Sequence, residues 1–346
     1  SFSISSMSFS CCDFLALFNA FEADIKQAFE AKSEPVFNEY VGNHITINRG
    51  DDGIAAVKFT QPVLIQKLSD NFTPISSRMP KTPALPGSNL CKGDDTGTLT
   101  GDQATRYRSL TATCMYMMQW SRPDIYQATR SLARYMHNPN ESHDKALNWL
   151  LSYVTATKNR GLLLKPDRVW DGSADFQWTI SGRSDSNYAA DIDDRRSVTG
   201  CRTFLNGAPV MFRSATQRFV TLSVTEAESA AGVTEAQDML YAYNILKSLG
   251  LKVELPMILE MDNKGAVDLA NSWSVGGRTR HIDVRMHFLR ELKSQGLLVI
   301  KHVPGDDNDA DIFTKNTTAA VFNKHVRNFV GNDEYVEVEV QDNPPS

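Results

Sequence analysis

Acidic residues in four short, widely separated segments could do chemistry in this chain. They are Asp185, Glu228, Asp262 and Asp311. Carboxylate oxygens are the ligands that Mg²⁺ prefers, and a pair of metal ions needs three or four carboxylates from separate elements. Because Asp and Glu are common, this spacing alone identifies nothing. The elements that position the four side chains have to support the interpretation.

A long helix is predicted over 223–249, and it directs Glu228 toward the interior. Ser223 and Glu226 form a capping-box pattern at its start. Glu228 begins a stripe at intervals of three or four residues that continues through Gly232, Ala236, Met239, Tyr243 and Leu246. Glu226 is about 200° away around the helix, so we predict that it faces solvent. Glu228 therefore needs a partner near the sheet.

The other acids occupy positions where a structural role competes with a functional one. Asp262 follows an apolar strand and precedes a helix, at the sheet edge where α/β proteins often bind ligands, but a helix N-cap is the alternative. Asp185 lies within a strand, where Asp is disfavoured unless something uses it. Asp309 and Asp311 fall at a helix start, where the helix dipole alone favours acids, so each taken singly is better explained as a cap.

The order of predicted elements indicates a mixed α/β fold. The first part is mostly helical, with helices over 14–30, 61–71, 104–138 and 141–157, strands over 43–48 and 54–60, and an irregular segment over 73–101. Asn206-Gly207 then predicts a type I′ hairpin between strands at 201–205 and 208–212. Strands at 257–261 and 297–303 alternate with helices at 264–271, 283–294 and 309–314, which gives a mixed sheet covered by helices.

Composition excludes several classes of protein. The chain has 346 residues, which favours two domains, and no apolar run approaches the ~20 residues of a membrane helix. Five cysteines without CxxC spacing argue against a disulfide framework and a zinc site. A net charge of −5 argues against non-specific coating of nucleic acid, but it allows a nuclease with local basic residues. Scattered, reduced thiols are typical of an intracellular protein, which we expect here, and the first residues lack the basic region of a secretion signal.

Motifs in a fixed order make the chain resemble the C-terminal part of the Pol polyprotein of copia-type retrotransposons, from about residue 20 to 318. The ribonuclease H motifs are Ser184-Asp185, Asp194-Arg195-Arg196-Ser197-Val198-Thr199-Gly200, Leu222-Ser223-Val224-Thr225-Glu226-Ala227-Glu228, Asp262-Asn263, Thr279-Arg280-His281-Ile282-Asp283-Val284-Arg285 and Ala310-Asp311-Ile312-Phe313-Thr314-Lys315. Upstream, Tyr107-Arg108-Ser109-Leu110 and Ser121-Arg122-Pro123-Asp124-Ile125 resemble the thumb-and-connection part of the reverse transcriptase.

The chain departs from the family pattern in three places. Cys11-Cys12-Asp13-Phe14 stands where the family has the Tyr-x-Asp-Asp turn of the polymerase, and no palm or fingers precede it. We therefore expect no polymerase activity. Tyr188 replaces a Trp that usually follows the first acidic motif, and Val303-Pro304-Gly305-Asp306-Asp307 lacks the His that many ribonucleases H carry there.

The resemblance implies a ribonuclease H-like fold preceded by a reverse-transcriptase remnant. The expected domains are 1–169 for the remnant, 170–318 for the ribonuclease H and 319–346 for a loose C-terminal tail. The family's four acids fall on Asp185, Glu228, Asp262 and Asp311, which would hold two Mg²⁺ ions, with Mn²⁺ as a substitute. The implied reaction is hydrolysis of the RNA strand of an RNA–DNA hybrid, selected by shape and 2′-hydroxyl contacts.

The implied partners are the hybrid and, as a further candidate, the missing palm-and-fingers portion. The candidate phosphate contacts are Arg195, Arg196, Lys264, Arg278, Arg280 and Arg285. For each of them a solvated surface charge is an equally good explanation. The alternative to an active nuclease is an inert remnant or a nucleic-acid-binding module, which the truncated polymerase favours and the intact set of acids opposes.

Overall fold

The computed structural model describes residues 11–29, 38–50, 54–70, 79–93, 97–272 and 280–330. The chain divides into two units, residues 1–40 and 41–346. The first unit contains helix α1 (Cys11–Ala28) and the short strand β1 (Glu39–Tyr40). Every other element that the structure describes belongs to the second unit, which also contains all four predicted catalytic acids.

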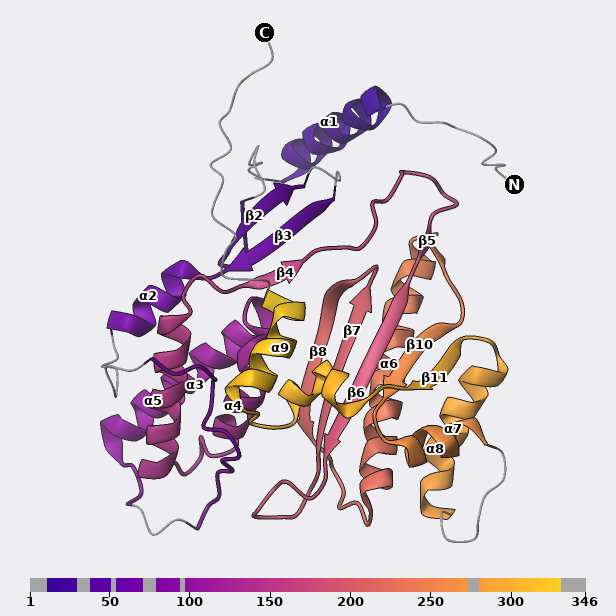
Figure 1. The fold of residues 1–346 in the computed structure, drawn as a ribbon. Coiled ribbons are helices and arrows are strands. Elements are labelled where there is room, and N and C mark those ends of the chain that lie inside the picture. Colours follow the sequence, from indigo (N-terminus) through magenta and orange to yellow (C-terminus); the bar gives the residue numbers. More distant parts are fainter. Residues whose placement is uncertain are drawn as a thin grey trace. The chain divides into compact units, whose positions relative to one another are not determined.

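A five-stranded mixed sheet forms the centre of the second unit (Figure 1). Its strands are β6 (Ile180–Asn187), β7 (Val198–Leu205), β8 (Ala208–Thr216), β10 (Met257–Met261) and β11 (Leu298–His302). The order across the sheet is β11-β10-β6-β7-β8, with β6, β7 and β8 antiparallel and β10 and β11 parallel to β6. Asn206 and Gly207 join β7 to β8 with φ of 47° and 78°, as a type I′ turn requires. The predicted mixed α/β class is confirmed.

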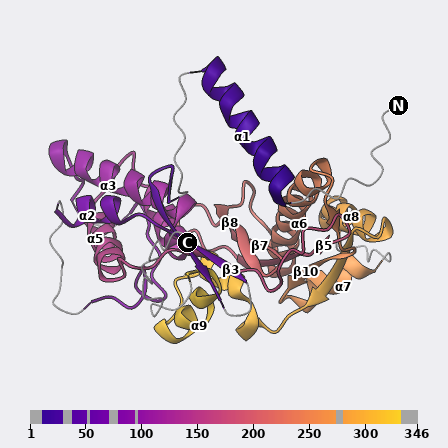
Figure 2. The same ribbon diagram turned by 90° about the horizontal axis from the view of Figure 1, so that it is seen from above.

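Helices cover both faces of this sheet (Figure 2). The long helix α6 (Val224–Ser248) crosses one face, beside α7 (Lys264–Asn271) and α8 (Arg280–Ser294). A Cβ on Gly182 would lie 2.3 Å from Oε1 of Glu235, so glycine is needed for α6 to approach β6 so closely. The 3₁₀ helices η2 (Gly305–Asp307) and η3 (Asp309–Phe313) and the helix α9 (Ala319–Val330) follow β11, and η3 contacts β6 and β7 from the opposite face.

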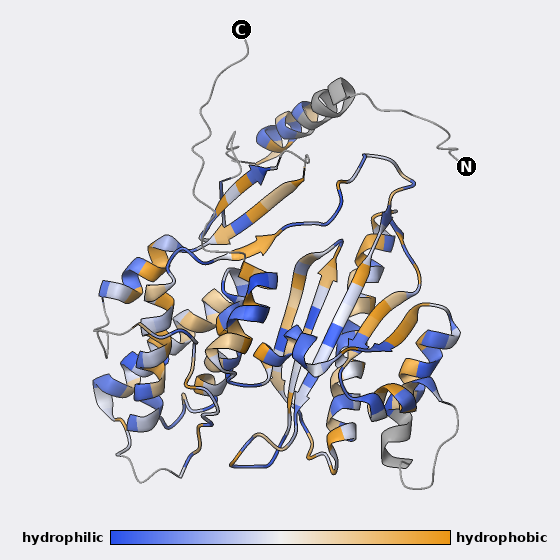
Figure 3. Cartoon of the chain, viewed as in Figure 1, coloured by the Kyte–Doolittle hydropathy of each residue, from blue (hydrophilic) through white to orange (hydrophobic). Residues whose placement is uncertain are grey.

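The residues before the sheet form a helical layer and a small sheet. The helical layer comprises α2 (Pro62–Asp70), α3 (Gly101–Trp120), η1 (Pro123–Ile125), α4 (Tyr126–Ala133) and α5 (Glu141–Ala156). The small sheet pairs β2 (Asn43–Arg49), β3 (Ala55–Thr60) and β4 (Leu162–Leu164) antiparallel. Figure 3 shows β4 as a hydrophobic strand, in line with its three leucines. The strands β5 (Gln177–Trp178) and β9 (Lys252–Val253) form a separate parallel pair.

The single helix predicted over 104–138 is wrong, because the chain breaks at Arg122 and Pro123. Proline lacks an N–H and cannot continue a helix, so it begins η1 instead. Arg122 is fully buried and donates from Nε and Nη2 to the two carboxylate oxygens of Asp124, both at 2.8 Å. The hydroxyl of Tyr153 donates to the same carboxylate at 2.7 Å, which ties the break to α5.

The prediction of a loose tail from 319 is wrong for residues 319–330. They form α9, whose Phe322, Val326 and Phe329 are buried in one core with side chains of α3, α5 and η3. Their spacing of four and three residues matches a helical face. Residues 331–346 lie outside the described part of the chain. The boundary at 169/170 stays a prediction, although described residues on both sides of it share this core.

Among the residues that the structure describes, no helix combines the length and the apolar character that crossing a membrane requires.

Candidate active site

Three of the four predicted acids lie together at one edge of the five-stranded sheet. Oxygen atoms of Asp185, Glu228 and Asp262 all lie within 4.8 Å of one another. Asp185 is near the end of β6, and Asp262 directly follows β10. These strands are parallel neighbours, with Met261 in register with Ser184, so their carboxyl ends bring the two aspartates side by side.

Glu228 reaches this edge from the first turns of α6. It is 4% exposed, and its Oε1 accepts a hydrogen bond of 3.2 Å from the backbone N–H of Ser186. Its Oε2 is buried without a hydrogen-bond partner. Gly232 packs against Met261 one turn further on, so the helical stripe faces the sheet as the sequence predicts. A buried, unpartnered carboxylate oxygen that lies beside two further carboxylates suits a bound cation.

The prediction that Glu226 faces solvent is wrong. Glu226 is 6% exposed, and its Oε2 accepts a hydrogen bond of 2.7 Å from the backbone N–H of Leu222. Nη1 of Arg285, which comes from α8, lies 3.6 Å from Oε1. The segment before α6 and the neighbouring helix therefore cover a side of α6 that an isolated helix would leave in water. Ser223 does cap the helix, accepting from the N–H of Glu226 at 3.1 Å.

Asp311 stays outside the group of three acids and reaches it through Lys315. Nζ of Lys315 lies 2.6 Å from Oδ1 of Asp311 and 3.3 Å from Oδ2 of Asp185. The hydroxyl of Thr314 also donates to the Asp185 carboxylate. Sequence reasoning missed both Lys315 and Thr314. The signal for Lys315 was its position four residues after Asp311 at a predicted helix start, where opposite charges come within reach of each other.

The site carries more negative charge than its surroundings compensate. Burial raises the pKa of Asp185 to about 6, with Lys315 acting against the shift and Asp311 adding to it. Burial, then Asp185 and Asp262, raise the pKa of Glu228 to about 9. Burial and Asp185 also raise the pKa of Asp262. Burial alone would lower the pKa of Lys315, but the carboxylates of Asp185 and Asp311 outweigh it and raise that pKa.

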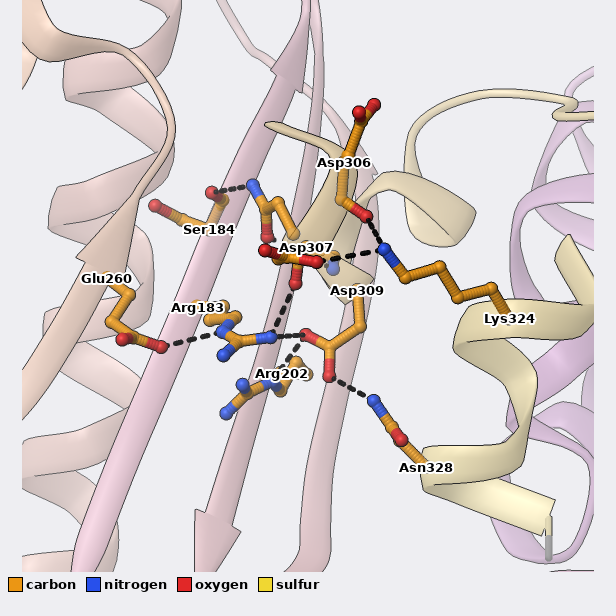
Figure 4. A network of polar contacts seen from close by, with 11 residues as sticks. Arg183, Ser184, Arg202, Glu260, Asp306, Asp307, Asp309, Lys324 and Asn328 are labelled. Carbon is orange, nitrogen blue, oxygen red and sulfur yellow. Dashed lines mark hydrogen bonds and ion pairs between the residues drawn. The ribbon is translucent and has the colours of Figure 1, made fainter. Parts of the chain in front are cut away.

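Asp309 belongs to a separate structural network (Figure 4). It is 1% exposed, and its Oδ1 lies 2.8 Å from Nε of Arg202 and 3.4 Å from Nη1 of Arg183. Burial alone would raise the pKa of Asp309, but these two guanidinium groups hold it below its usual range. Asn328 of α9 donates to the other carboxylate oxygen at 2.9 Å. The network fixes the start of η3 against β6 and β7, and thereby positions the segment that carries Asp311.

The predicted phosphate contacts that the structure describes come from separate elements. Lys264 begins α7 and is exposed beside Asp262, whereas Arg195 and Arg196 lie in the loop between β6 and β7. The guanidinium of Arg285 lies 3.7 Å from the centroid of the Phe219 ring. It lines a groove together with Arg213 and Arg218, which sequence reasoning did not single out. Arg278 and the side chain of Arg280 lie outside the described residues.

Three curated relatives that match 85% or more of the chain are plant transposon proteins. The "Retrovirus-related Pol polyprotein from transposon TNT 1-94" of Nicotiana tabacum is 28% identical over 297 residues, 85% of this chain and 21% of that protein. The counterpart from transposon RE1 of Arabidopsis thaliana is 29% identical over 299 residues, which are 86% of this chain and 19% of that protein. The chain's homologues are thus retrovirus-related Pol polyproteins, and it spans about a fifth of their length.

A shorter relative matches part of the chain. The "Secreted RxLR effector protein 161" of Plasmopara viticola is 34% identical over 135 residues, 39% of this chain and 89% of that protein. No family model matches the chain.

Solved structures of ribonucleases H1 resemble less than half of the chain. LC11-RNase H1, isolated from compost, has a TM-score of 0.31 and 16% identity, and the match covers 43% of this chain and 98% of that one. The RNase H1 of the archaeon Halobacterium salinarum has a TM-score of 0.28 and 16% identity, and the match covers 43% of this chain and 97% of that one.

Proposed function

We propose that this chain, which belongs to one family with the Plasmopara protein and is homologous to the plant Pol polyproteins, is a retroelement ribonuclease H. The reaction would be metal-dependent hydrolysis of the RNA strand of an RNA–DNA hybrid. One observation carries the proposal: three carboxylates from separate elements converge within 4.8 Å at the carboxyl edge of the sheet, and one buried oxygen among them has no hydrogen-bond partner.

The donor set fits a divalent hard cation. Asp185, Glu228 and Asp262 offer oxygen atoms only. Burial and the neighbouring carboxylates raise their pKa values, and a bound cation would stabilise their charged forms. Asp311, which shares Lys315 with Asp185, would contribute to holding a second ion. Bound Mg²⁺ or Mn²⁺ would lower the pKa of the attacking water and stabilise the leaving 3′ oxygen.

The chain's own residues orient the acids and receive the substrate. The N–H of Ser186 and the hydroxyl of Thr314 fix the Glu228 and Asp185 carboxylates, so little reorganisation accompanies binding. Exposed basic residues beside the site, Lys264 and Arg195, would meet phosphates of the duplex. Selection of a hybrid would depend on duplex shape and on 2′-hydroxyl contacts.

The test is cleavage of a labelled RNA–DNA hybrid by the purified chain, with single-stranded RNA and duplex DNA as comparison substrates. We expect cleavage of the hybrid alone, only with Mg²⁺ or Mn²⁺. Asp185→Asn should abolish it, whereas Asp144→Asn, a change on the α5 surface, should not. Cleavage that persists in EDTA would refute metal dependence, and no cleavage with any metal ion would favour the inert remnant.

A further inference from the structure

The loop between β6 and β7, residues 188–197, has a backbone shape that needs outside support. Ala189 and Arg195 have φ of 47° and 59°, in the left-handed region that residues other than glycine seldom adopt. Such conformations persist where the surrounding structure imposes them. Two backbone hydrogen bonds close the loop, from Asp191 N–H to the Arg196 carbonyl at 3.0 Å and from Arg195 N–H to the Asp191 carbonyl at 2.9 Å.

The outside support comes from the helical layer. Arg134, directly after α4, forms an ion pair with Asp191, which is 3% exposed, and lies 3.7 Å from the carboxylate of Asp193. The hydroxyl of Tyr135 lies 3.0 Å from Oδ2 of Asp193, and the N–H of Lys92 donates to Oδ1 at 3.0 Å. Both acids therefore bind groups that precede the five-stranded sheet in sequence.

These supporting groups are themselves fixed. The ring of Tyr135 stacks on the ring of His143 with centroids 4.0 Å apart, and its hydroxyl lies 2.8 Å from the Leu90 carbonyl. His143 completes a capping box with Asn140 at the start of α5. A continuous set of contacts thus runs from the start of α5 to the loop.

The loop buries one charge and exposes another. Asp191 turns toward the helical layer, whereas Arg195 is exposed, and the loop begins three residues after Asp185. We infer that Arg134 and Tyr135 are positioning residues, which hold this loop so that Arg195 and Arg196 meet the phosphates of a hybrid bound at the acids. The inference rests on the proposed function. It adds that the helical layer determines how well the nuclease site holds its substrate.

The test compares Arg134→Met with Arg106→Met in the full chain. Arg106 makes a more exposed ion pair, to Asp144 at 3.1 Å, between two helices of the helical layer, and it does not contact the acids of the loop. Binding of an RNA–DNA hybrid is measured by fluorescence anisotropy in EDTA, and KM and kcat are measured with Mg²⁺. We expect Arg134→Met to weaken binding about tenfold and to raise KM by the same factor, with kcat unchanged. A tenfold change is what the loss of a hydrogen-bonded charge pair produces. Arg134→Lys should recover part of the loss, and Arg106→Met should bind like wild type.

A double-mutant cycle separates positioning from direct contact, because Arg134 also carries a positive charge. If Arg134 acts through the loop, adding Arg134→Met to the pair Arg195→Ala and Arg196→Ala causes no further loss of binding. Additive losses, a fall in kcat with unchanged KM, or an equal loss in Arg106→Met would overturn the inference.

The proposed function and this inference fail in different ways. A wild-type chain that binds no hybrid refutes both. A wild-type chain that binds and cleaves the hybrid, while Arg134→Met binds equally well, refutes only the positioning role. If wild type binds the hybrid without cleaving it, the binding measurements still decide the positioning role.

Discussion

Replacing Glu228 with Gln should stabilise the metal-free protein while abolishing cleavage. The Glu228 carboxyl is buried beside two other acids, and its pKa rises from the ordinary 4.5 to about 9. Between these pH values the unfolded chain is ionised while the folded protein keeps the proton, so stability falls as pH rises, by about 1.4 kcal/mol per pH unit. A Gln side chain does not titrate and avoids this loss.

The expected gain follows from the same values. At pH 7, well above the ordinary pKa of Glu, keeping Glu228 protonated costs about 3 kcal/mol. In the wild type, Oε2 of Glu228 has no hydrogen-bond partner. The NH₂ group of Gln would take this position and also lack a partner, which costs about 1 kcal/mol. The net gain of about 2 kcal/mol corresponds to a rise in Tm of about 3 °C, because a unit of about 300 residues has an entropy of unfolding of about 0.6 kcal/mol/K. At pH 5, near the ordinary pKa, the two proteins should differ little.

The assay is thermal unfolding of both proteins in EDTA from pH 5 to pH 8, repeated with Mg²⁺. The difference in Tm should grow with pH in EDTA and should shrink or reverse with Mg²⁺, because an ion that binds only the folded wild type stabilises it. Glu226→Gln is the matched control. Glu226 already faces an N–H and a guanidinium, so removing its charge brings no gain. A difference for Glu228→Gln that stays constant from pH 5 to pH 8 would refute the reasoning.

Three further predictions concern the surroundings of the site. Lys315→Met should lower Tm in EDTA by several degrees, because the ammonium compensates Asp185 and Asp311, and Mg²⁺ should restore most of the loss in the same melting experiment. Asp309→Asn should cost about 3 kcal/mol in urea unfolding at pH 7, since it leaves the buried guanidinium of Arg202 without its carboxylate partner, whereas Arg183 keeps Glu260. Because the folded pKa of Asp309 is depressed, this difference should diminish as pH falls below 3.8 toward that folded pKa. Gly182→Ala should cost about 1 to 3 kcal/mol in the same assay, because its Cβ would collide with α6, and an unchanged midpoint would show that the helix yields freely.

The sequence predicted well those features that one element decides alone. The stripe that begins at Glu228 depends only on helical periodicity, and the hairpin at Asn206 depends only on turn chemistry. The position of Glu226 depends instead on Arg285, which lies in another helix, and on Leu222, so periodicity within α6 could not place it.

Other errors had signals in the sequence that competing patterns outweighed. Pro123 marks the break in the helix predicted over 104–138, but the apolar spacing continues past it. Phe322 and Phe329 mark a helical face in the segment predicted to be loose, where the acidic, proline-containing end dominated the interpretation. Lys315 also carried a signal, its position four residues after Asp311, but such pairs most often lie at the surface and contribute little.

The shared core also has a consequence for synthesis of the protein. Phe322 and Phe329 of α9 pack with side chains of α3 and α5, yet the ribosome makes α9 only after every strand of the five-stranded sheet. Until α9 emerges, the nascent helical layer presents uncovered apolar surface, the condition under which chains aggregate or recruit chaperones. A product that stops after Lys315 would contain every proposed catalytic acid and still leave that surface open, so premature termination is expected to give insoluble rather than inactive protein.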